Sequence, residues 1–371
     1  MDFSFSDEQQ ALREVARKIL EAEATPDRLR EVEKSEERID RRLWAELAKA
    51  NLLGAALPEA HGGSGMGFFE LCLLLEEIGR AVAPVPVWPT LVLAGLPIAR
   101  FGSAEQQKRW LPPIVAGESI LTAALAEPAN VDPLAPATHA VRDGSDFRLS
   151  GTKFCVPAGM VAERILVPAK TGEGRVGLFL VDPRAPGVTV ERQVATSREI
   201  QAQIRLDAQR VRADEVIGDP EAGLDALQWL VERATAALCA MQLGVAERAL
   251  RITADYAAQR QQFDRPIGSF QAVHTRAADA YVELETLRLT AWQAAYLLSQ
   301  HETASEAASI AKFFAGDAAH TVTYAAEHLH GGIGADVDYP IHRYYLWSRQ
   351  IELTLGSSAS HLAALGEKLA R

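Results

Sequence analysis

The sequence lacks the features that mark secreted, metal-binding and membrane-spanning proteins. Its three cysteines, Cys72, Cys155 and Cys239, form no CxxC or other metal-like spacing, so neither a disulfide framework nor a metal site is expected. The longest apolar runs, such as residues 71–75, are far shorter than the roughly 20 residues of a membrane-spanning helix. The opening residues MDFSFSDEQQ have neither the basic nor the apolar region of an export signal. We therefore expect a reducing, cytoplasmic setting.

An excess of basic residues is also missing. The chain has 38 lysines and arginines against 49 aspartates and glutamates, which gives a formal net charge of −11. Such a chain has no general attraction to nucleic acid or to anionic lipid headgroups. Any phosphate-bearing ligand would need a local group of basic side chains. We expect no nucleic-acid partner and no membrane span.

The composition that is present belongs to a folded protein with more than one domain. The chain has 371 residues, and a typical domain has roughly 150. Hydrophobic residues make up 48% and charged residues 23%, as in ordinary globular proteins. Two or three folded units are expected.

Three regions with different sequence patterns follow one another along the chain. Residues 1–117 read as an N-terminal helical domain, which begins with a capping box formed by Ser6 and Gln9. Residues 118–218 contain short β-type runs without intervening helices, which predict an antiparallel barrel or sandwich. Residues 219–371 are rich in Ala, Leu, Glu and Arg and predict a bundle of long helices.

Individual elements can be predicted within these regions. Helices are predicted near residues 40–51, 68–81, 221–258, 270–300 and 303–329. Strands are predicted at residues 164–167, 176–181, 188–191 and 200–206, with a hairpin turn at 143–144. The glycine-rich residues 63–67 have no preceding strand and no βαβ unit, so we expect a connection between helices and not a dinucleotide fingerprint.

Several phrases of the sequence are shared with a known family. The strongest are RQQF at 260–263, PIG at 266–268 with FQ at 270–271, and HGGIG at 330–334 followed by YPIHRY at 339–344. Weaker ones are FSFSDEQQALRE at the N-terminus, LPE followed by GGSG at 57–65, and residues 101–112. Together they resemble the flavin-dependent acyl-CoA dehydrogenase family over nearly the whole chain. The resemblance implies a helical domain, a middle antiparallel β-barrel, a C-terminal four-helix bundle and a tetramer.

The resemblance also implies an FAD site shared between subunits. In the family, the two strong phrases reach the adenosine pyrophosphate of the FAD that a neighbouring subunit holds. By resemblance the cofactor-binding residues are Arg260, Gln262, Phe263, Gln271, Gly331 and Gly332. Arginine carries a permanent charge with forked donors for phosphate oxygens, and glycine lets backbone amides approach a pyrophosphate. The alternative is that this arginine and these glycines only cap helices.

The catalytic base of the family has no counterpart in the chain. Family chemistry removes a proton next to the thioester carbonyl, which requires a carboxylate. The two positions where the family carries this glutamate hold Leu355, before Gly356, and Ala234. Glu352 and Glu232 lie nearby and are the candidates for a relocated base, whereas Glu247 is expected to be structural. We therefore assign no catalytic residue.

The β region lacks residues that cradle the flavin ring in the family. The phrase Thr-Glu-Pro is replaced by Ala126-Glu127-Pro128, without its hydroxyl. A tryptophan and a threonine that face the flavin in the family are replaced by Cys155 and Pro157. Cysteine offers no indole platform, and proline offers neither a hydroxyl nor a backbone donor. The residues that serve a neighbour are kept, while those that serve the chain's own site are lost.

This asymmetry indicates a subunit that completes an FAD site without catalysing the reaction itself. The expected assembly is an α2β2 heterotetramer of an FAD-dependent oxidoreductase, with a paralogous catalytic partner, an acyl-CoA substrate and an electron-transfer flavoprotein as acceptor. The phrases at 263–266 and 339–345 resemble the β subunits of heteromeric actinobacterial enzymes that act on steroid side-chain CoA esters. Lipid metabolism and steroid degradation are the processes that this resemblance implies.

Two other functions compete with this interpretation. The first is a self-sufficient homotetrameric acyl-CoA dehydrogenase with a relocated base, which would be yellow and active when expressed alone. The second is a non-enzymatic binding protein, because one branch of the family associates with DNA. That branch has a basic surface, for which an acidic chain offers no equivalent.

Overall fold

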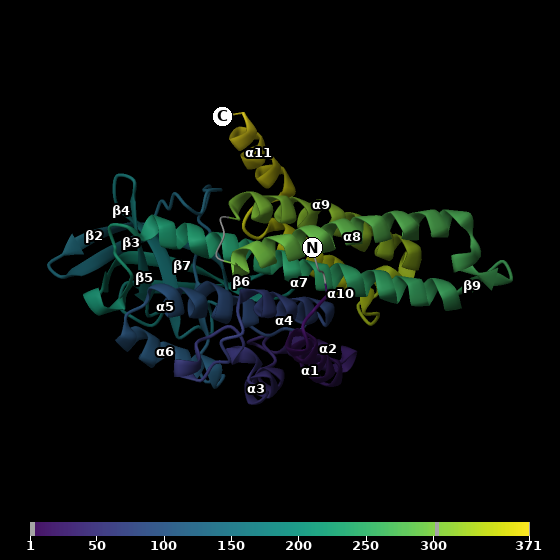
Figure 1. Cartoon of the computed structure of the whole chain (residues 1–371), viewed down its shortest axis with the longest axis horizontal. Coiled ribbons are helices and arrows are strands. Elements are labelled where there is room, and N and C mark those ends of the chain that lie inside the picture. The colour runs from purple at the N-terminus through teal and green to yellow at the C-terminus, as the bar shows by residue number, and fades with distance from the viewer. Residues whose placement is uncertain (1–3, 301–303, 371) are drawn as a thin grey trace. The chain divides into compact units, whose positions relative to one another are not determined.

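The computed structural model of the protein describes residues 4–300 and 304–370 (Figure 1). Residues 1–3, 303 and 371, where some predicted segments begin or end, lie outside the described residues. Helices occupy the described chain up to Val115, strands run from Leu121 to Ile217, and long helices follow from Gly223. Within the two described ranges, no helix is both long and apolar enough to cross a bilayer.

The chain divides into two compact units that do not follow the order of the sequence. Unit 1 comprises Met1–Leu29, Cys72–Ala83 and Thr235–Arg371, and unit 2 comprises Arg30–Leu71 and Pro84–Ala234. Three helices, α2, α4 and α7, contribute residues to both units. The division into three domains at 117/118 and 218/219 therefore stays a prediction, although the changes from helix to strand and back fall close to these positions.

The N-terminal helices begin where the sequence predicts. Ser6 accepts a hydrogen bond from the backbone N–H of Gln9, and the Gln9 side chain accepts one from the backbone N–H of Ser6, so the predicted capping box is confirmed. Leu12, Ala16 and Leu20 form the buried face of the first helix. The helices of this region are α1 (Asp7–Glu23), α2 (Pro26–Lys34), α3 (Arg41–Lys49), α4 (Phe68–Arg80), α5 (Leu96–Phe101) and α6 (Ala104–Val115).

The middle region forms one sheet of eight strands. They are β1 (Leu121–Ala123), β2 (His139–Asp143), β3 (Asp146–Pro157), β4 (Arg164–Gly172), β5 (Arg175–Val181), β6 (Val188–Val194), β7 (Ile200–Val211) and β8 (Val216–Ile217). The order along the sheet is β6-β7-β3-β2-β4-β5-β8, and β1 pairs with β4. All four predicted strands and the hairpin turn at 143–144 are confirmed.

The prediction of a closed antiparallel barrel is wrong. The two ends of the strand order, β6 and β8, do not pair, so the sheet is open. In addition, β1 runs parallel to β4. With only two residues, β8 offers too short a ladder for closure, and the largely exposed β6 forms the other free edge. Alternating short strands specify a half-buried sheet but do not specify whether its edges meet.

A buried ion pair holds the loop between β1 and β2 against β3. The Lys153 ammonium lies 2.7 Å from the Glu127 carboxylate, and both side chains are almost completely buried. Glu127 also accepts hydrogen bonds from the backbone N–H groups of Ala137 and Thr138. Burial alone would raise the pKa of Glu127, but Lys153 and these donors lower it to about 2. The surviving glutamate of the altered Thr-Glu-Pro phrase is therefore a structural residue.

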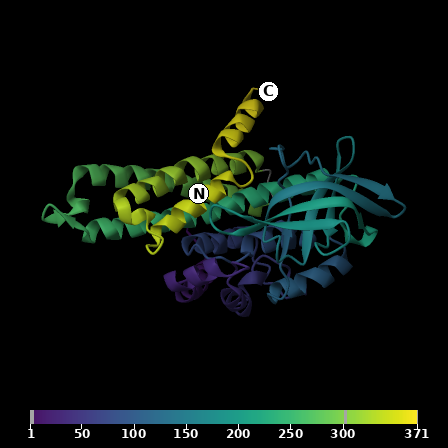
Figure 2. The same cartoon turned by 180° about the vertical axis from the view of Figure 1, so that it is seen from behind.

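Long helices make up the C-terminal region, as predicted. They are α7 (Gly223–Gln259), α8 (Gln271–Ser299), α9 (Ser305–His330), α10 (Ile341–Leu353) and α11 (Ser358–Leu369). Within unit 1, α8 and α9 pack along each other, and α10 and α11 also pack on α9. The far end of α11 projects away from the other C-terminal helices in both views (Figures 1 and 2). The finer description as a four-helix bundle stays a prediction.

Glycines let α4 and α7 pack at very short range inside unit 1. A Cβ on Gly244 would lie 1.9 Å from the carbonyl oxygen of Glu76, and a Cβ on Gly79 would lie 1.9 Å from that of Met241. Real Cβ atoms do not approach a carbonyl so closely, so each glycine is required by the other helix. This contact fixes the carboxyl end of α4 beside α7.

Candidate functional site

The first shared sequence motif, RQQF at 260–263, forms the turn at the end of α7. The helix stops at Gln259, and the backbone N–H of Arg260 still donates to the carbonyl of Tyr256. A two-residue hairpin follows, with β9 (Gln261–Gln262) paired to β10 (Arg265–Pro266). Its turn residues, Phe263 and Asp264, have φ angles of 53° and 61°, as tight hairpin turns require. The hairpin lies at one end of the long C-terminal helices (Figure 1).

The second family phrase follows the end of α9. Gly331 has a φ of 65° and donates its backbone N–H to carbonyls of the last helical turn. It therefore caps α9, as the alternative interpretation of the glycines requires. The 3₁₀ turn η6 (Gly331–Ala335) then leads toward α10.

Three neighbouring aromatic rings bring the two motifs together. The Tyr256 ring stacks on the His330 ring with centroids 4.4 Å apart, and the Tyr339 ring lies 5.2 Å from His330. These residues belong to the last turn of α7, the last turn of α9 and the segment before α10. Arg260 and the Gly331-Gly332 turn, which are distant in sequence, therefore lie at the same end of unit 1. We call this region the Arg260–Gly332 end.

The predicted cofactor residues at this end are all exposed. They are Arg260, Gln262, Phe263, Gln271, Gly331 and Gly332. The Phe263 side chain is 87% exposed and touches only the edge of Phe270 among aromatic rings. Arg260 forms no ion pair with any carboxylate in the described residues. An arginine and an aromatic ring that the chain does not use internally remain available to an external group.

Glycine at position 332 is consistent with a group outside the chain that approaches the backbone closely. At Gly331 the positive φ already requires glycine, and at Gly334 a Cβ would lie 2.4 Å from a Glu327 oxygen. At Gly332 neither reason applies, because its φ is not in the left-handed region and a Cβ would meet no atom within 4 Å. Nothing within the described chain demands a glycine there. A pyrophosphate bound against the backbone amides would explain the glycine, because it would leave no space for a side chain.

Two titratable groups beneath the glycine turn, Glu327 and His330, have pKa values shifted by burial. Burial raises the pKa of Glu327 to about 7. Burial also lowers the pKa of His330, although its hydrogen bond to the Ala326 carbonyl acts in the opposite direction. Near neutral pH the imidazole is therefore uncharged and the carboxyl is partly protonated. Tyr256 and Glu327 were not predicted from the sequence; the position of Tyr256 one turn before Arg260 was the available signal.

The turn at which the resemblance places the family's base has a leucine at that position. Leu355 and Gly356 follow α10 with φ angles of 57° and 97°. The buried Lys312 ammonium donates to the carbonyls of Ile351, Glu352 and Gly356 at 3.1, 2.8 and 2.8 Å. These bonds supply a donor to carbonyls at and just after the end of α10, of which that of Ile351 also accepts from the backbone N–H of Thr354. We call residues 354–357 the Leu355 turn.

The nearby carboxylates are already engaged. Glu352 pairs with Arg349, and Glu232 accepts a hydrogen bond from the side chain of Gln228 at 3.1 Å. Glu247 lies between Arg80 and Arg288 at 3.2 and 3.3 Å, in agreement with its expected structural role.

The second base position and the flavin-facing positions lie in unit 2. Ala234 is fully buried, and its carbonyl accepts a hydrogen bond from the Trp88 indole at 3.2 Å. Cys155 is exposed and lies in an irregular stretch of β3 with a φ of 50°. Pro157 ends the same strand opposite Gln201. None of these positions supplies a carboxylate, an aromatic platform or a hydroxyl.

Comparison with known proteins identifies the family. Residues 6–118 match the family described as acyl-CoA dehydrogenase, N-terminal domain, and residues 221–370 match acyl-CoA dehydrogenase, C-terminal domain. The chain is 40% identical to Acyl-CoA dehydrogenase FadE27 of Mycobacterium tuberculosis over 378 residues, which cover 100% of the chain and 99% of the relative.

Solved structures agree over the full length. A variant of the Tcur3481-Tcur3483 steroid ACAD is 49% identical with a TM-score of 0.92, over 98% of both chains. The ChsE4-ChsE5 complex from Mycobacterium tuberculosis is 40% identical with a TM-score of 0.95, over 100% of this chain and 99% of that one. Structures of the family bind FAD, and one has been solved with FADH2. The chain therefore belongs to the acyl-CoA dehydrogenase family of FAD-dependent oxidoreductases, which act on CH–CH bonds.

Proposed function

We propose that the chain is the non-catalytic, FAD-completing subunit of an α2β2 acyl-CoA dehydrogenase. One contrast carries this proposal. The Arg260–Gly332 end exposes a cation, an aromatic ring and an unexplained glycine, whereas the Leu355 turn has the backbone of a base-bearing turn without a carboxylate. The paralogous partner subunit would supply the base and the flavin cradle.

The chain's own residues would act on the diphosphate end of the cofactor. The Arg260 guanidinium would bind phosphate oxygens through charge-assisted hydrogen bonds, and the backbone at Gly331-Gly332 would approach the pyrophosphate. Phe263 and Gln271 would contact the adenosine side, and Gln262 would position the hairpin. The bound FAD supplies the acceptor for the hydride that leaves the β carbon of the acyl chain.

The chain by itself would lack what the reaction needs near the thioester. Removal of the α proton requires a carboxylate close to the substrate. Leucine and alanine cannot accept a proton, and Glu352 is held by Arg349. Cys155 and Pro157 remove the flavin-facing groups. The rival proposal of a self-sufficient homotetramer would need Glu352 or Glu232 to leave its present partner.

The substrate class and the partners extend the proposal. Two structures that this chain resembles are complexes of two different chains, and one of them is a steroid ACAD. We infer that the substrate is the CoA thioester of a steroid side chain, that a paralogous subunit completes the assembly, and that an electron-transfer flavoprotein accepts the electrons. We place this chemistry in the cytoplasm.

Expression of the chain alone and with its paralogue tests the proposal. The lone chain is expected to purify without flavin absorbance and without acyl-CoA oxidation. The co-expressed complex should contain two FADs per four subunits and oxidise the thioester. A lone chain that is yellow and oxidises acyl-CoA would support the self-sufficient homotetramer instead.

A further inference from the structure

A second group of arginines surrounds a cavity in unit 1, away from the Arg260–Gly332 end. The cavity has a volume of about 380 Å³ and lies among α1, α4, α7 and α10. Its basic residues are Arg80, Arg248 and Arg343, each from a different helix. Along α7, Arg248 precedes Arg260 by twelve residues, which corresponds to roughly 18 Å at 1.5 Å per residue.

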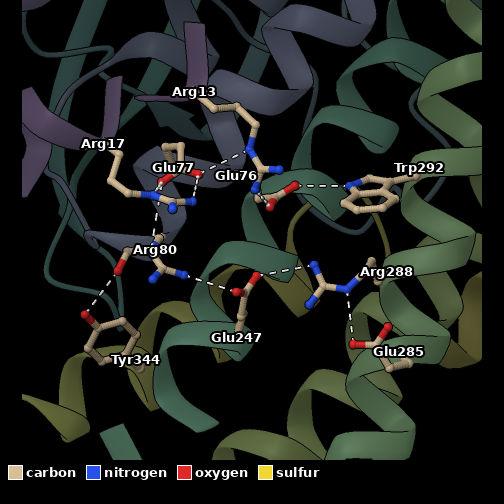
Figure 3. A network of polar contacts seen from close by, with 10 residues as sticks. All are labelled: Arg13, Arg17, Glu76, Glu77, Arg80, Glu247, Glu285, Arg288, Trp292 and Tyr344. Atoms are coloured by element: carbon tan, nitrogen blue, oxygen red, sulfur yellow. Dashed lines mark hydrogen bonds and ion pairs between the residues drawn. The ribbon is translucent and has the colours of Figure 1, made fainter. Parts of the chain in front are cut away.

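A charge-balanced network, drawn in Figure 3, reaches this cavity through Glu77 and Arg80. It contains four arginines, Arg13, Arg17, Arg80 and Arg288, and four glutamates, Glu76, Glu77, Glu247 and Glu285. The Trp292 indole also donates to Glu76 at 3.1 Å. Because these charges offset one another, Glu77 and Arg80 contribute little net charge to the cavity.

The remaining charges of the lining favour an anion. Arg248 forms no ion pair with a carboxylate in the described parts of the chain, and Arg343 is only 4% exposed. The other lining carboxylate, Glu21, is exposed, and its charge acts on Arg17, whose pKa is raised mainly by its hydrogen bonds to Glu77. In a chain with a net charge of −11, a pocket wall with an arginine such as Arg248 is a local exception.

The basic groups converge on one hydroxyl. Tyr344 is buried and donates its hydroxyl to the Arg80 carbonyl at 3.1 Å. Burial raises the pKa of this phenol, while the charges of Arg248, Arg80 and Arg343 act to lower it. All three arginines line the same cavity as Tyr344, near the start of α10. The amino end of a helix adds a favourable dipole for an anion.

We propose that Arg248, Arg343 and Tyr344 form a binding site for the phosphate group of a small organic molecule. Forked arginine donors match phosphate oxygens. The other walls are apolar and include Leu20, Ile252 and Pro340. A volume of about 380 Å³ falls in the usual range for small-molecule pockets and exceeds what inorganic phosphate needs. The ligand therefore combines a phosphate with an apolar body.

Thermal unfolding of the full chain with two probes tests this site. Inorganic phosphate and phenyl phosphate are each compared with sodium chloride at the same ionic strength. Both phosphates should raise Tm above the chloride value, and phenyl phosphate should bind the more tightly of the two because its ring meets the apolar walls. An equal Tm in all three salts would overturn the proposal.

Matched arginine variants locate the binding. Arg248→Met should weaken phenyl phosphate binding by about tenfold or more, and Arg248→Lys should retain part of the affinity because it keeps the charge. Arg251→Met, on the exposed side of the same helix, is the control and should bind like the unaltered chain. Equal binding by the Arg248→Met and Arg251→Met proteins would refute the proposal, and the Arg248→Lys protein serves as the test if the methionine variant does not fold.

Two further measurements distinguish a ligand in this cavity from a phosphate bound elsewhere and from a contact between subunits. The Arg260→Met protein should show the same rise in Tm with phosphate as the unaltered chain. If this variant shows no rise in Tm, the phosphate binds at the Arg260–Gly332 end instead. The response should also persist in the complex with the paralogous subunit. Its disappearance there would show that the cavity is a subunit contact and would overturn the ligand proposal.

Discussion

The Arg260–Gly332 end and the Leu355 turn are both built from family phrases, but only the first keeps its chemical groups. At the Arg260–Gly332 end, a hairpin and a glycine turn are joined by stacked rings and display side chains that the chain itself does not use. At the Leu355 turn, Lys312 preserves the backbone while a leucine stands where a carboxylate is expected. The Leu355 turn thus has a defined backbone, held by Lys312, at a position where it offers no carboxylate.

The largest effect is expected from removing the ammonium beneath the Leu355 turn. Lys312→Met removes the ammonium donor from three carbonyls, and those of Glu352 and Gly356 keep no other donor in the described residues, so the free energy of unfolding should fall by about 3 kcal/mol. Urea denaturation measures this loss. Lys368→Met, on the exposed face of α11, is the control and should change stability by less than about 0.5 kcal/mol. Equal stability of the two variants would show that the turn does not depend on Lys312.

Removal of the exposed cation should weaken cofactor binding without affecting the fold. In the complex with the paralogue, Arg260→Met should lower FAD affinity by about 2 kcal/mol, or roughly thirtyfold, because a charge-assisted contact to phosphate is lost. Flavin content after gel filtration reports this change. Arg251→Met should keep its flavin. An Arg260→Met complex that retains FAD fully would argue against the proposed role of this end.

Gly332→Ala tests whether the glycine is required for cofactor binding or for packing within the chain. A methyl group there meets no atom of the chain, so the stability of the lone subunit should change by less than about 0.5 kcal/mol. In the complex, the same methyl group should lower FAD affinity by about 1 kcal/mol, or roughly fivefold. Loss of stability in the lone subunit would instead assign the glycine to internal packing.

The buried carboxyl beneath the glycine turn should make stability depend on pH. Because the folded pKa of Glu327 is raised from 4.5 to about 7, folding favours its protonated form. Its contribution is therefore fully present below pH 4.5 and is lost as the pH rises through about 7. Glu327→Gln should remove this dependence, so that the variant is the more stable protein at pH 8. Urea midpoints at pH 5 and pH 8 test the sign.

The smallest effect is expected from restoring the missing carboxylate. Leu355→Glu places an acid in the Leu355 turn, but Cys155 and Pro157 still replace the flavin-facing residues. Acyl-CoA oxidation by the lone variant should therefore stay at background. Measurable turnover, confirmed by its absence in a Leu355→Gln control, would mean that the chain retains a usable flavin site of its own.

Local signals in the sequence predicted much of the secondary structure. Ser6 and Gln9 form the expected capping box because the two partners are three residues apart. The strands at 164–167 and 200–206 were predicted as short β-type runs between turn residues. Closure of the sheet was not predictable in this way, since it depends on whether β6 and β8 meet, and they do not.

In the candidate site, too, some residues could be predicted from the sequence and others only from the tertiary structure. Arg260, Gly331 and the substituted base position Leu355 could be named from spacing and resemblance. Tyr256 and Glu327 could not, because their importance depends on which helix ends lie together. Lys312 was equally invisible: a lysine within a helical pattern is usually exposed, and only the fold shows it buried against the end of α10.

The sequence by itself determined which side chains are present, where helices and strands form, and that Leu355 and Ala234 occupy the two positions predicted for the base, because these properties depend on residue identity and short-range spacing. Only the tertiary structure decided that the two family phrases share one end of unit 1, that the sheet stays open, and that three arginines surround one cavity. Each of these features depends on packing between residues far apart in the chain, which no local pattern specifies.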